Sequence, residues 1–119
     1  DALRHQQRAA EALYDQAAAQ YRATVLAAFR DVADALHAID ADARALQAAL
    51  AAEQAAQKSL AIATRQWEVG AAGRPAVLQA QQGYQQAAIA LVQAQAARYA
   101  DTVALFQALG GGWQEQESR

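Results

Sequence analysis

The sequence predicts an all-α protein, a long antiparallel α-helical hairpin (coiled coil) with no β-sheet in this segment. Three observations lead to that fold class. Alanine, the strongest helix former, recurs throughout the 119 residues. Glycine and proline are absent from about Ala2 to Val69 and return together in the segment 70–75. A second helix-compatible stretch follows and is interrupted only by Gly83. One short turn between two long helices gives a rod rather than a globule.

The punctuation by glycine and proline sets the expected boundaries within one domain. We expect a helix over residues 2–69, a tip at 70–74, a second helix over 75–109 and a polar tail at 110–119. Pro75 suits the first turn of a helix, where its missing N–H is not needed. Gly70 and Gly73 can supply the positive φ that a short turn requires. Gly110 stands where the C-cap of the second helix is expected.

Apolar residues alternate at spacings of three and four along both helices, the pattern of a left-handed coiled coil. The predicted line on the first helix is Phe29, Val32, Leu36, Ile39, Ala43, Leu46 and Leu50. The predicted line on the second helix is Ile89, Val92, Ala96, Tyr99, Val103 and Phe106. A neighbouring line on the second helix includes Tyr84, Leu91 and Leu105 but is interrupted by polar Gln95 and Arg98. Gly83 favours close backbone packing over a kink.

The two predicted helices differ in length. If the chain reverses near residue 72, Leu109 reaches back only to about Asp34–Ala38. The apolar stripe from Leu3 to Phe29 then has no partner within the chain. Either other chains cover this stripe, or the first helix breaks near residues 39–42 and folds back into a three-helix bundle. We favour the first, since no glycine or proline marks a second break, and we expect the isolated segment to self-associate.

Composition argues against several classes of function. The formal charge is −2 and the cationic residues are scattered, so no basic surface for nucleic acid is expected. There is no cysteine, and His37 with Asp34 and Asp40 is weak evidence for a metal, so we expect no metal site and no cofactor. No arrangement of nucleophile, base and acid suggests an enzyme. The sequence begins at Asp1 without methionine, as a mature segment or an excised fragment does.

The tip carries the residue types that dominate protein interfaces. Trp67 precedes Gly70, and Arg74 follows Gly73. Tryptophan and arginine are the commonest interface anchors, which favours a partner-binding tip. An equally weighted alternative is that Trp67 only closes the end of the helix–helix contact.

Three segments together resemble one known family. They are Tyr21–Leu36 (YRATVLAAFRDVADAL), Trp67–Gly70 with Val77–Gln81 (WEVG…VLQAQ), and Ala104–Trp113 (ALFQALGGGW). Their order and spacing resemble the outer-membrane efflux proteins of Gram-negative bacteria, the TolC-like family of trimeric channel-tunnels. Each motif alone is modest, but the three extend over nearly the whole chain.

The resemblance implies a transport role. Family members are homotrimers whose β-strands form an outer-membrane barrel and whose helices form a periplasmic tunnel. This segment would be the long helix, periplasmic tip and returning helix of the second repeat, and the strands that contact the membrane would lie outside it. It would be part of a passive exit duct in a tripartite efflux or type I secretion system, with a periplasmic adaptor protein and an inner-membrane pump as partners.

The resemblance also implies roles for individual residues near the tip. The adaptor-binding candidates are Trp67, Glu68, Val69, Gly70, Ala72, Gly73 and Arg74. Ala76 and Gln79 stand where some members carry the aspartates of the pore-closing ring. The family often has tyrosine at the position of Trp67. Without carboxylates, a ring of Ala76 and Gln79 would close the pore sterically and by hydrogen bonds.

Two other classes of function fit the residues alone. A coiled-coil adaptor or interaction module would use the same hairpin without any pore. A helical bundle that binds lipid reversibly would need a broader apolar face and a belt of lysines, which this sequence lacks. We therefore place the adaptor second and the lipid-binding bundle third.

Overall fold

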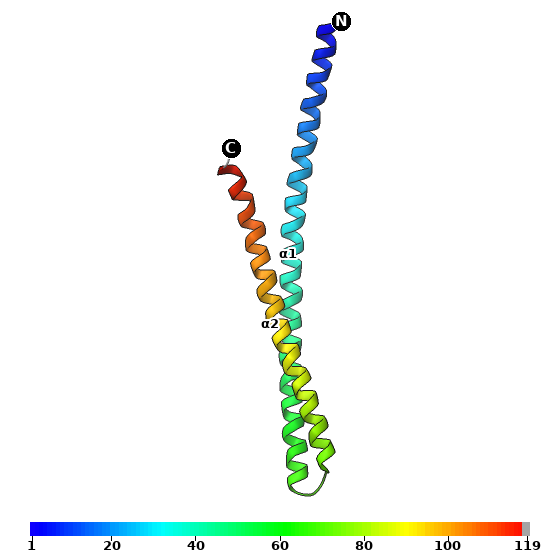
Figure 1. Cartoon of the computed structure of the whole chain (residues 1–119), viewed down its shortest axis with the longest axis vertical. Coiled ribbons are helices and arrows are strands. Elements are labelled where there is room, and N and C mark those ends of the chain that lie inside the picture. The colour runs from blue at the N-terminus through cyan, green and yellow to red at the C-terminus, as the bar shows by residue number, and fades with distance from the viewer. Residues whose placement is uncertain (118–119) are drawn as a thin grey trace.

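The computed structural model describes the backbone of residues 1–117 and the side chains of residues 1–110. Within that range the chain forms two helices, α1 (Ala2–Glu68) and α2 (Arg74–Glu117), and no strand. The helices run antiparallel and make a rod of 101 × 26 × 16 Å, with the turn at one end and the N-terminus at the other (Figure 1). The predicted helical hairpin is confirmed.

Helix α1 is continuous over 67 residues. At about 1.5 Å per residue it is about 100 Å long, which accounts for the long dimension of the molecule. It passes through residues 39–42 without interruption, so the three-helix bundle is excluded. The physical reason is local, because a run of alanine and long polar residues offers no residue that breaks a helix.

Helix α1 ends in a glycine-dependent cap. Gly70 has φ of 77°, the only positive φ among the described residues. The amide of Gly70 donates to the carbonyl oxygen of Trp67 at 3.1 Å, and the amide of Ala71 donates to that of Gln66 at 2.7 Å. These two bonds are the pair that defines a Schellman motif. The expectation for Gly70 is confirmed.

The start of α2 differs in one detail from the expectation. Gly73 does not adopt a positive φ, so it does not supply the second left-handed residue of the turn. Its carbonyl oxygen instead accepts the amide of Ala76 at 3.2 Å and begins the hydrogen bonding of α2. A Cβ at Gly73 would stand 3.3 Å from Pro75 Cδ, so the small residue relieves crowding there. Pro75 lies in the first helical turn, as predicted.

The predicted C-cap at Gly110 and polar tail at 110–119 are wrong over the described residues. Helix α2 continues through Gly110 to Glu117 rather than ending at Leu109. Gly110 keeps a negative φ, and glycine in a helix costs only about 1 kcal/mol relative to alanine, so it permits a C-cap without enforcing one. Positions 118 and 119 of the predicted tail lie outside the described residues.

The helices meet along lines that contain many alanines. The buried and half-buried residues of α1 that recur at spacings of three and four are Ile39, Asp42, Leu46, Ala49, Glu53, Ala56, Leu60 and Ala63. Those of α2 are Val77, Ala80, Tyr84, Ala87, Leu91, Ala94, Asp101 and Leu105. We call these the inner lines. The best-buried residues, Ala63 and Val77, both lie near the tip.

The inner lines correct the predicted ones. On α1 the predicted residues Val32, Ile39, Ala43 and Leu46 are half-buried, but Phe29, Leu36 and Leu50 are exposed. On α2 the entire predicted line is exposed, and the weaker neighbouring line faces α1. The reason is that the alanines between the large residues of the inner lines let the two helices approach closely, which favours these lines over the predicted ones.

The remaining fold features follow from this arrangement. Gly83 lies on the outer face of α2 with nothing within 4 Å of an added Cβ, so the predicted close packing there is wrong.

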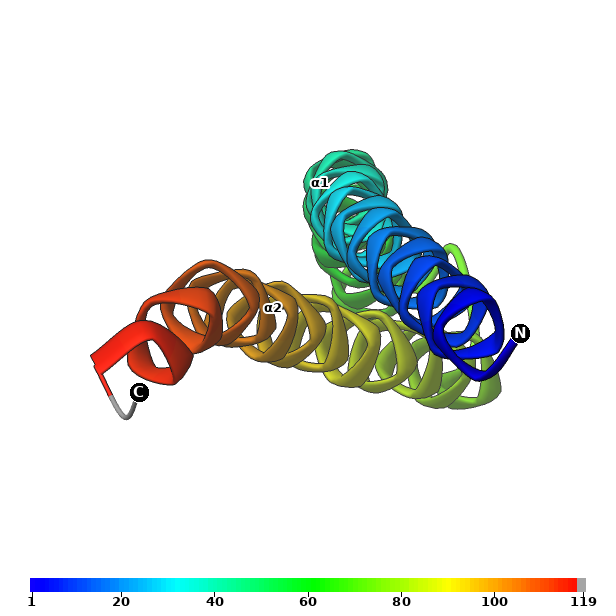
Figure 2. The same ribbon diagram turned by 90° about the horizontal axis from the view of Figure 1, so that it is seen from above.

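Away from the tip the two helices cross and then diverge. Viewed along the rod, the far end of α2 stands well away from α1 (Figure 2). The paired region therefore lies in the half of the molecule that contains the turn.

Candidate functional site

The tip presents its candidate residues to the outside. Trp67 is 47% exposed and Val69 is 59% exposed at the end of α1. Glu68 lies 3.7 Å from Arg65, an ion pair between exposed side chains that contributes little to stability. The tip is held by backbone hydrogen bonds rather than by these side chains, so Trp67 and Val69 are available for contacts with another molecule.

The remaining tip candidates lie in the turn itself. Gly70, Gly73 and Arg74 are exposed, whereas Ala72 is half-buried. The structure thus places all seven predicted tip residues at one end of the rod within a single short turn (Figure 1). This arrangement gathers exposed apolar side chains with one acid, Glu68, and one cation, Arg74, at the extreme end of the molecule.

Ala76 and Gln79 lie one turn into α2. Both are exposed, and a spacing of three places them on the same face of the helix. Val77 between them is buried against α1, so the Ala76–Gln79 face is directed away from the helix–helix contact. Neither residue carries a charge, so this face is electrically neutral.

The line of apolar residues on α2 that was predicted to face α1 is exposed to solvent in the structure. We call it the outer line of α2; its members are Ile89, Val92, Ala96, Tyr99, Val103 and Phe106. Ile89, Val92, Tyr99 and Phe106 are each more than half exposed, between 58% and 75%. The exposed stripe of α1 from Leu3 to Phe29 adds Tyr14, Tyr21 and Phe29, each at least 70% exposed. The apolar periodicity predicted that the line on α2 would face α1, and the structure leaves it exposed instead.

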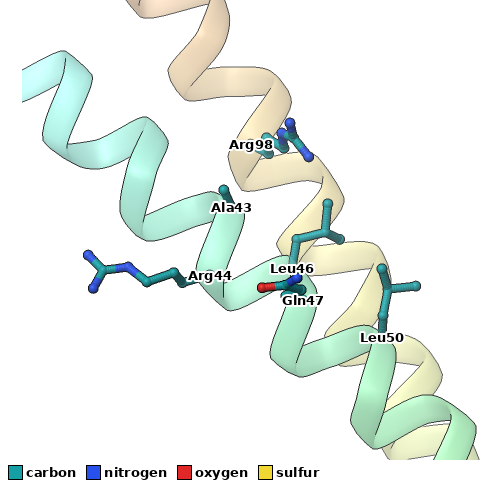
Figure 3. Close-up of a pocket in the computed structure, with 6 residues that line it drawn as sticks. All are labelled: Ala43, Arg44, Leu46, Gln47, Leu50 and Arg98. Carbon is teal, nitrogen blue, oxygen red and sulfur yellow. The ribbon is translucent and has the colours of Figure 1, made fainter.

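A shallow groove runs between the helices where they begin to separate. Leu46 and Leu50 of α1 lie on its floor, and Arg98 of α2 lies on the opposite side (Figure 3). Arg44 points away from α2 and pairs instead with Asp40 at 2.9 Å (Figure 3). The groove is open to solvent, and its lining combines the two arginines with the apolar side chains of Leu46 and Leu50.

Two carboxyl groups meet across the helices one turn beyond this groove. Asp42 and Asp101 belong to the inner lines and lie at equal distances along the chain from the Ala71–Ala72 pair. Hydrogen bonding to the Asp101 carboxyl raises the pKa of Asp42, as do desolvation and the charge of Asp101, while Arg98 acts in the opposite direction. Asp42 Oδ2 is buried and has no donor among the described residues. Sequence reasoning missed this pair because it depends on the exact register of the helices.

Over the described residues the structure contains no cluster of three or more histidine, cysteine or acidic side chains able to hold a metal ion. His37 and the neighbouring aspartates Asp34 and Asp40 are thus not brought together with a further ligand. Neither α1 nor α2, over the same range, is long and apolar enough to cross a membrane.

The chain matches known proteins over almost all of its length. The family model described as outer membrane efflux protein matches residues 1–111. Outer membrane protein OprJ of Pseudomonas aeruginosa is 38% identical over 109 residues, which cover 92% of this chain and 23% of OprJ. No solved structure matches significantly.

Two further relatives are exporters by name. The pyoverdine export outer membrane protein OpmQ of Pseudomonas putida is 35% identical over 112 residues, 94% of this chain and 24% of OpmQ. The probable efflux pump outer membrane protein TtgC of the same species is 35% identical over 98 residues, 82% of this chain and 20% of TtgC. The chain thus spans about a quarter of the length of the curated relatives it matches. With the family model matching residues 1–111, the chain belongs to the outer membrane efflux protein family.

Proposed function

We propose that this chain is the periplasmic helical hairpin of an outer-membrane efflux channel and forms part of the wall of a passive exit duct. The observation that carries the proposal is the outer line of α2. A hairpin that leaves its most regular apolar line exposed is incomplete, because such a line on a helix is normally buried against a neighbour. Packing side by side with further helices would complete a tunnel wall.

The asymmetry of the hairpin supports the same proposal. Helix α1 extends far beyond the paired region, and its exposed stripe from Leu3 to Phe29 needs helices that this chain does not supply. Neighbouring chains of a homotrimer would cover both the stripe and the outer line. The names of OprJ, OpmQ and TtgC place those proteins in the outer membrane, and we extend that location to the assembly containing this chain.

We assign the tip to a periplasmic adaptor protein that links the duct to an inner-membrane pump. Trp67 and Val69 provide exposed apolar area, and Arg74 adds a cation beside them. Tryptophan and arginine anchor protein interfaces when they are surrounded by a rim that excludes water. Ala76 and Gln79, on the neutral exposed face just inside the tip, would line the narrow end of the pore.

A chimera tests this proposal. The matched 109 residues of OprJ are replaced by this chain, and dye accumulation is measured in Pseudomonas aeruginosa cells that lack OprJ. We expect the chimera to restore export, and the Val92→Glu chimera to lose both export and trimer formation. Gln93→Glu, which adds the same charge at the next position, is the matched control.

Crosslinking distinguishes a duct from the second candidate, a coiled-coil adaptor module without a pore. Photocrosslinkers at Trp67 and Arg74 should capture a periplasmic adaptor protein, whereas crosslinkers at Val92 should capture other copies of the channel. Capture of an inner-membrane pump at Val92 and none of the channel would favour the adaptor module instead.

A further inference from the structure

The paired acids Asp42 and Asp101 lie near the end of the inner lines that is far from the tip, with only Ile39 and Leu105 of those lines beyond them. On the side toward the tip the inner lines alternate large residues with alanine, as at Ala56 and Ala87. At the next position of the alanine series, both helices carry an aspartate instead. Toward its C-terminus α2 leads away from α1, as both views show (Figures 1 and 2).

The chemistry of this contact depends on a proton. Two ionised carboxylates only accept hydrogen bonds, so they repel each other when they face across a narrow gap. One shared proton turns the same contact into a hydrogen bond between the helices. The buried Oδ2 of Asp42, without a donor among the described residues, is the atom that a protonated Asp101 would satisfy.

We propose that Asp42 and Asp101 form a proton-dependent clasp that sets how far the two helices open beyond the paired region. With a shared proton the clasp is closed and extends the helix–helix contact toward Ile39 and Leu105. When both carboxyls ionise, their repulsion opens the hairpin from this level outward, while the alanine-rich contact near the tip stays closed.

Charged groups on both helices surround the clasp and act on its carboxyl groups. From α2, Arg98 stands one turn from Asp101 and lowers the pKa of Asp42. On α1, Asp40 and Arg44 are exposed and neutralise each other at 2.9 Å. Hydrogen bonding to Asp101, desolvation and the charge of Asp101 together raise the pKa of the Asp42 carboxyl above that of a free aspartate.

Distances between spin labels on the 119-residue chain test the clasp directly. The chain has no native cysteine, so labels go only where cysteines are introduced. One labelled pair, at Asp34 and Ala104, reports beyond the clasp, and a second, at Gln57 and Gln82, reports near the tip; all four positions are exposed. Dilution with unlabelled chain removes distances between molecules.

We expect the first distance to increase by about 5 Å, the radius of a helix with its side chains, as the pH rises through the titration of the pair. The second distance should stay constant. Asp101→Asn and Asp42→Asn each leave one acid facing an amide, so the first distance should remain short at every pH. Arg98→Gln should move the transition to higher pH, since it removes the charge that favours ionisation.

Asp40→Asn is the matched control, because it removes an acid two residues from Asp42 that faces solvent and Arg44. It should leave the transition unchanged. A first distance that does not vary with pH in the wild-type chain would overturn the proposal. Equal effects of Asp40→Asn and Asp101→Asn would overturn it too, since they would indicate general charge rather than a clasp.

Discussion

The amide of Ala71 donates a 2.7 Å hydrogen bond to the carbonyl oxygen of Gln66, and this contact fixes where the rod turns. It can form only because the intervening Gly70 adopts φ of 77°. The direction in which α2 leaves the tip, and hence the register of every residue across the helices, follows from this cap.

Replacing Gly70 therefore has a definite cost. Gly70→Ala should lower the free energy of unfolding by about 1–2 kcal/mol, the strain of a left-handed alanine. No side-chain clash contributes, since a Cβ at Gly70 would meet nothing within 4 Å. Urea unfolding followed by circular dichroism measures the change.

Gly83→Ala is the control, and it should change the free energy of unfolding in the opposite direction. Gly83 is exposed in the middle of α2 with open space around it, so alanine should raise the free energy of unfolding by up to about 1 kcal/mol. If both glycine substitutions shifted stability in the same direction, the cap would not be the reason for the effect at Gly70.

Val77 carries the largest share of the packing near the tip. It is 6% exposed, so Val77→Ala should cost about 1.5 kcal/mol for two buried methyl groups. Val92→Ala removes the same atoms from a side chain that is 63% exposed and should leave the hairpin's unfolding nearly unchanged in dilute solution. Equal losses for the two variants in dilute solution would mean that α1 covers the outer line as well.

Helix propensity and the positions of glycine and proline predicted the two helices better than they predicted which residues lie between them. The absence of glycine and proline before Gly70 was enough to predict one continuous helix, because helix propensity acts residue by residue. The end of α2 was mispredicted at Gly110, where glycine permits a turn but does not require one.

The faces of the helices could not be assigned from periodicity. Both lines of α2 repeat with the same spacing, and the periodicity favours the uninterrupted one over the one that contains Gln95 and Arg98. In the structure the half-buried Ala80, Ala87 and Ala94 face α1 instead, since small residues let two helices approach closely. The tip residues were predicted to lie together because they are adjacent in sequence. The Asp42–Asp101 pair is distant in sequence and shifts out of contact with a change of one residue in register.

The exposed outer line predicts self-association of the isolated chain. Sedimentation velocity should show a weight-average mass that rises with concentration, since apolar side chains such as Val92 and Phe106 gain free energy when covered. Val92→Glu should reduce association at least tenfold, whereas Gln93→Glu, at an exposed polar position, should not. A strict monomer at the highest attainable concentration would contradict this prediction.

The neutral face formed by Ala76 and Gln79 predicts how the proposed channel responds to cations. Divalent cations are usually held by carboxylates, and a ring of Ala76 and Gln79 from the three chains of the proposed trimer offers only neutral amide oxygens. Conductance of the proposed full-length channel in a planar bilayer should therefore not be blocked by Mg²⁺ at this ring. Gln79→Asp places three carboxylates around the pore and should introduce block that weakens as the pH falls below about 4, where aspartate takes up a proton. Gln82→Asp adds the same charge about one turn further along α2, and this variant should be blocked less.

One outcome would contradict the steric gate. If divalent cations blocked the unsubstituted channel, and the block disappeared only when Gln79 was replaced by alanine, the amide ring itself would bind cations.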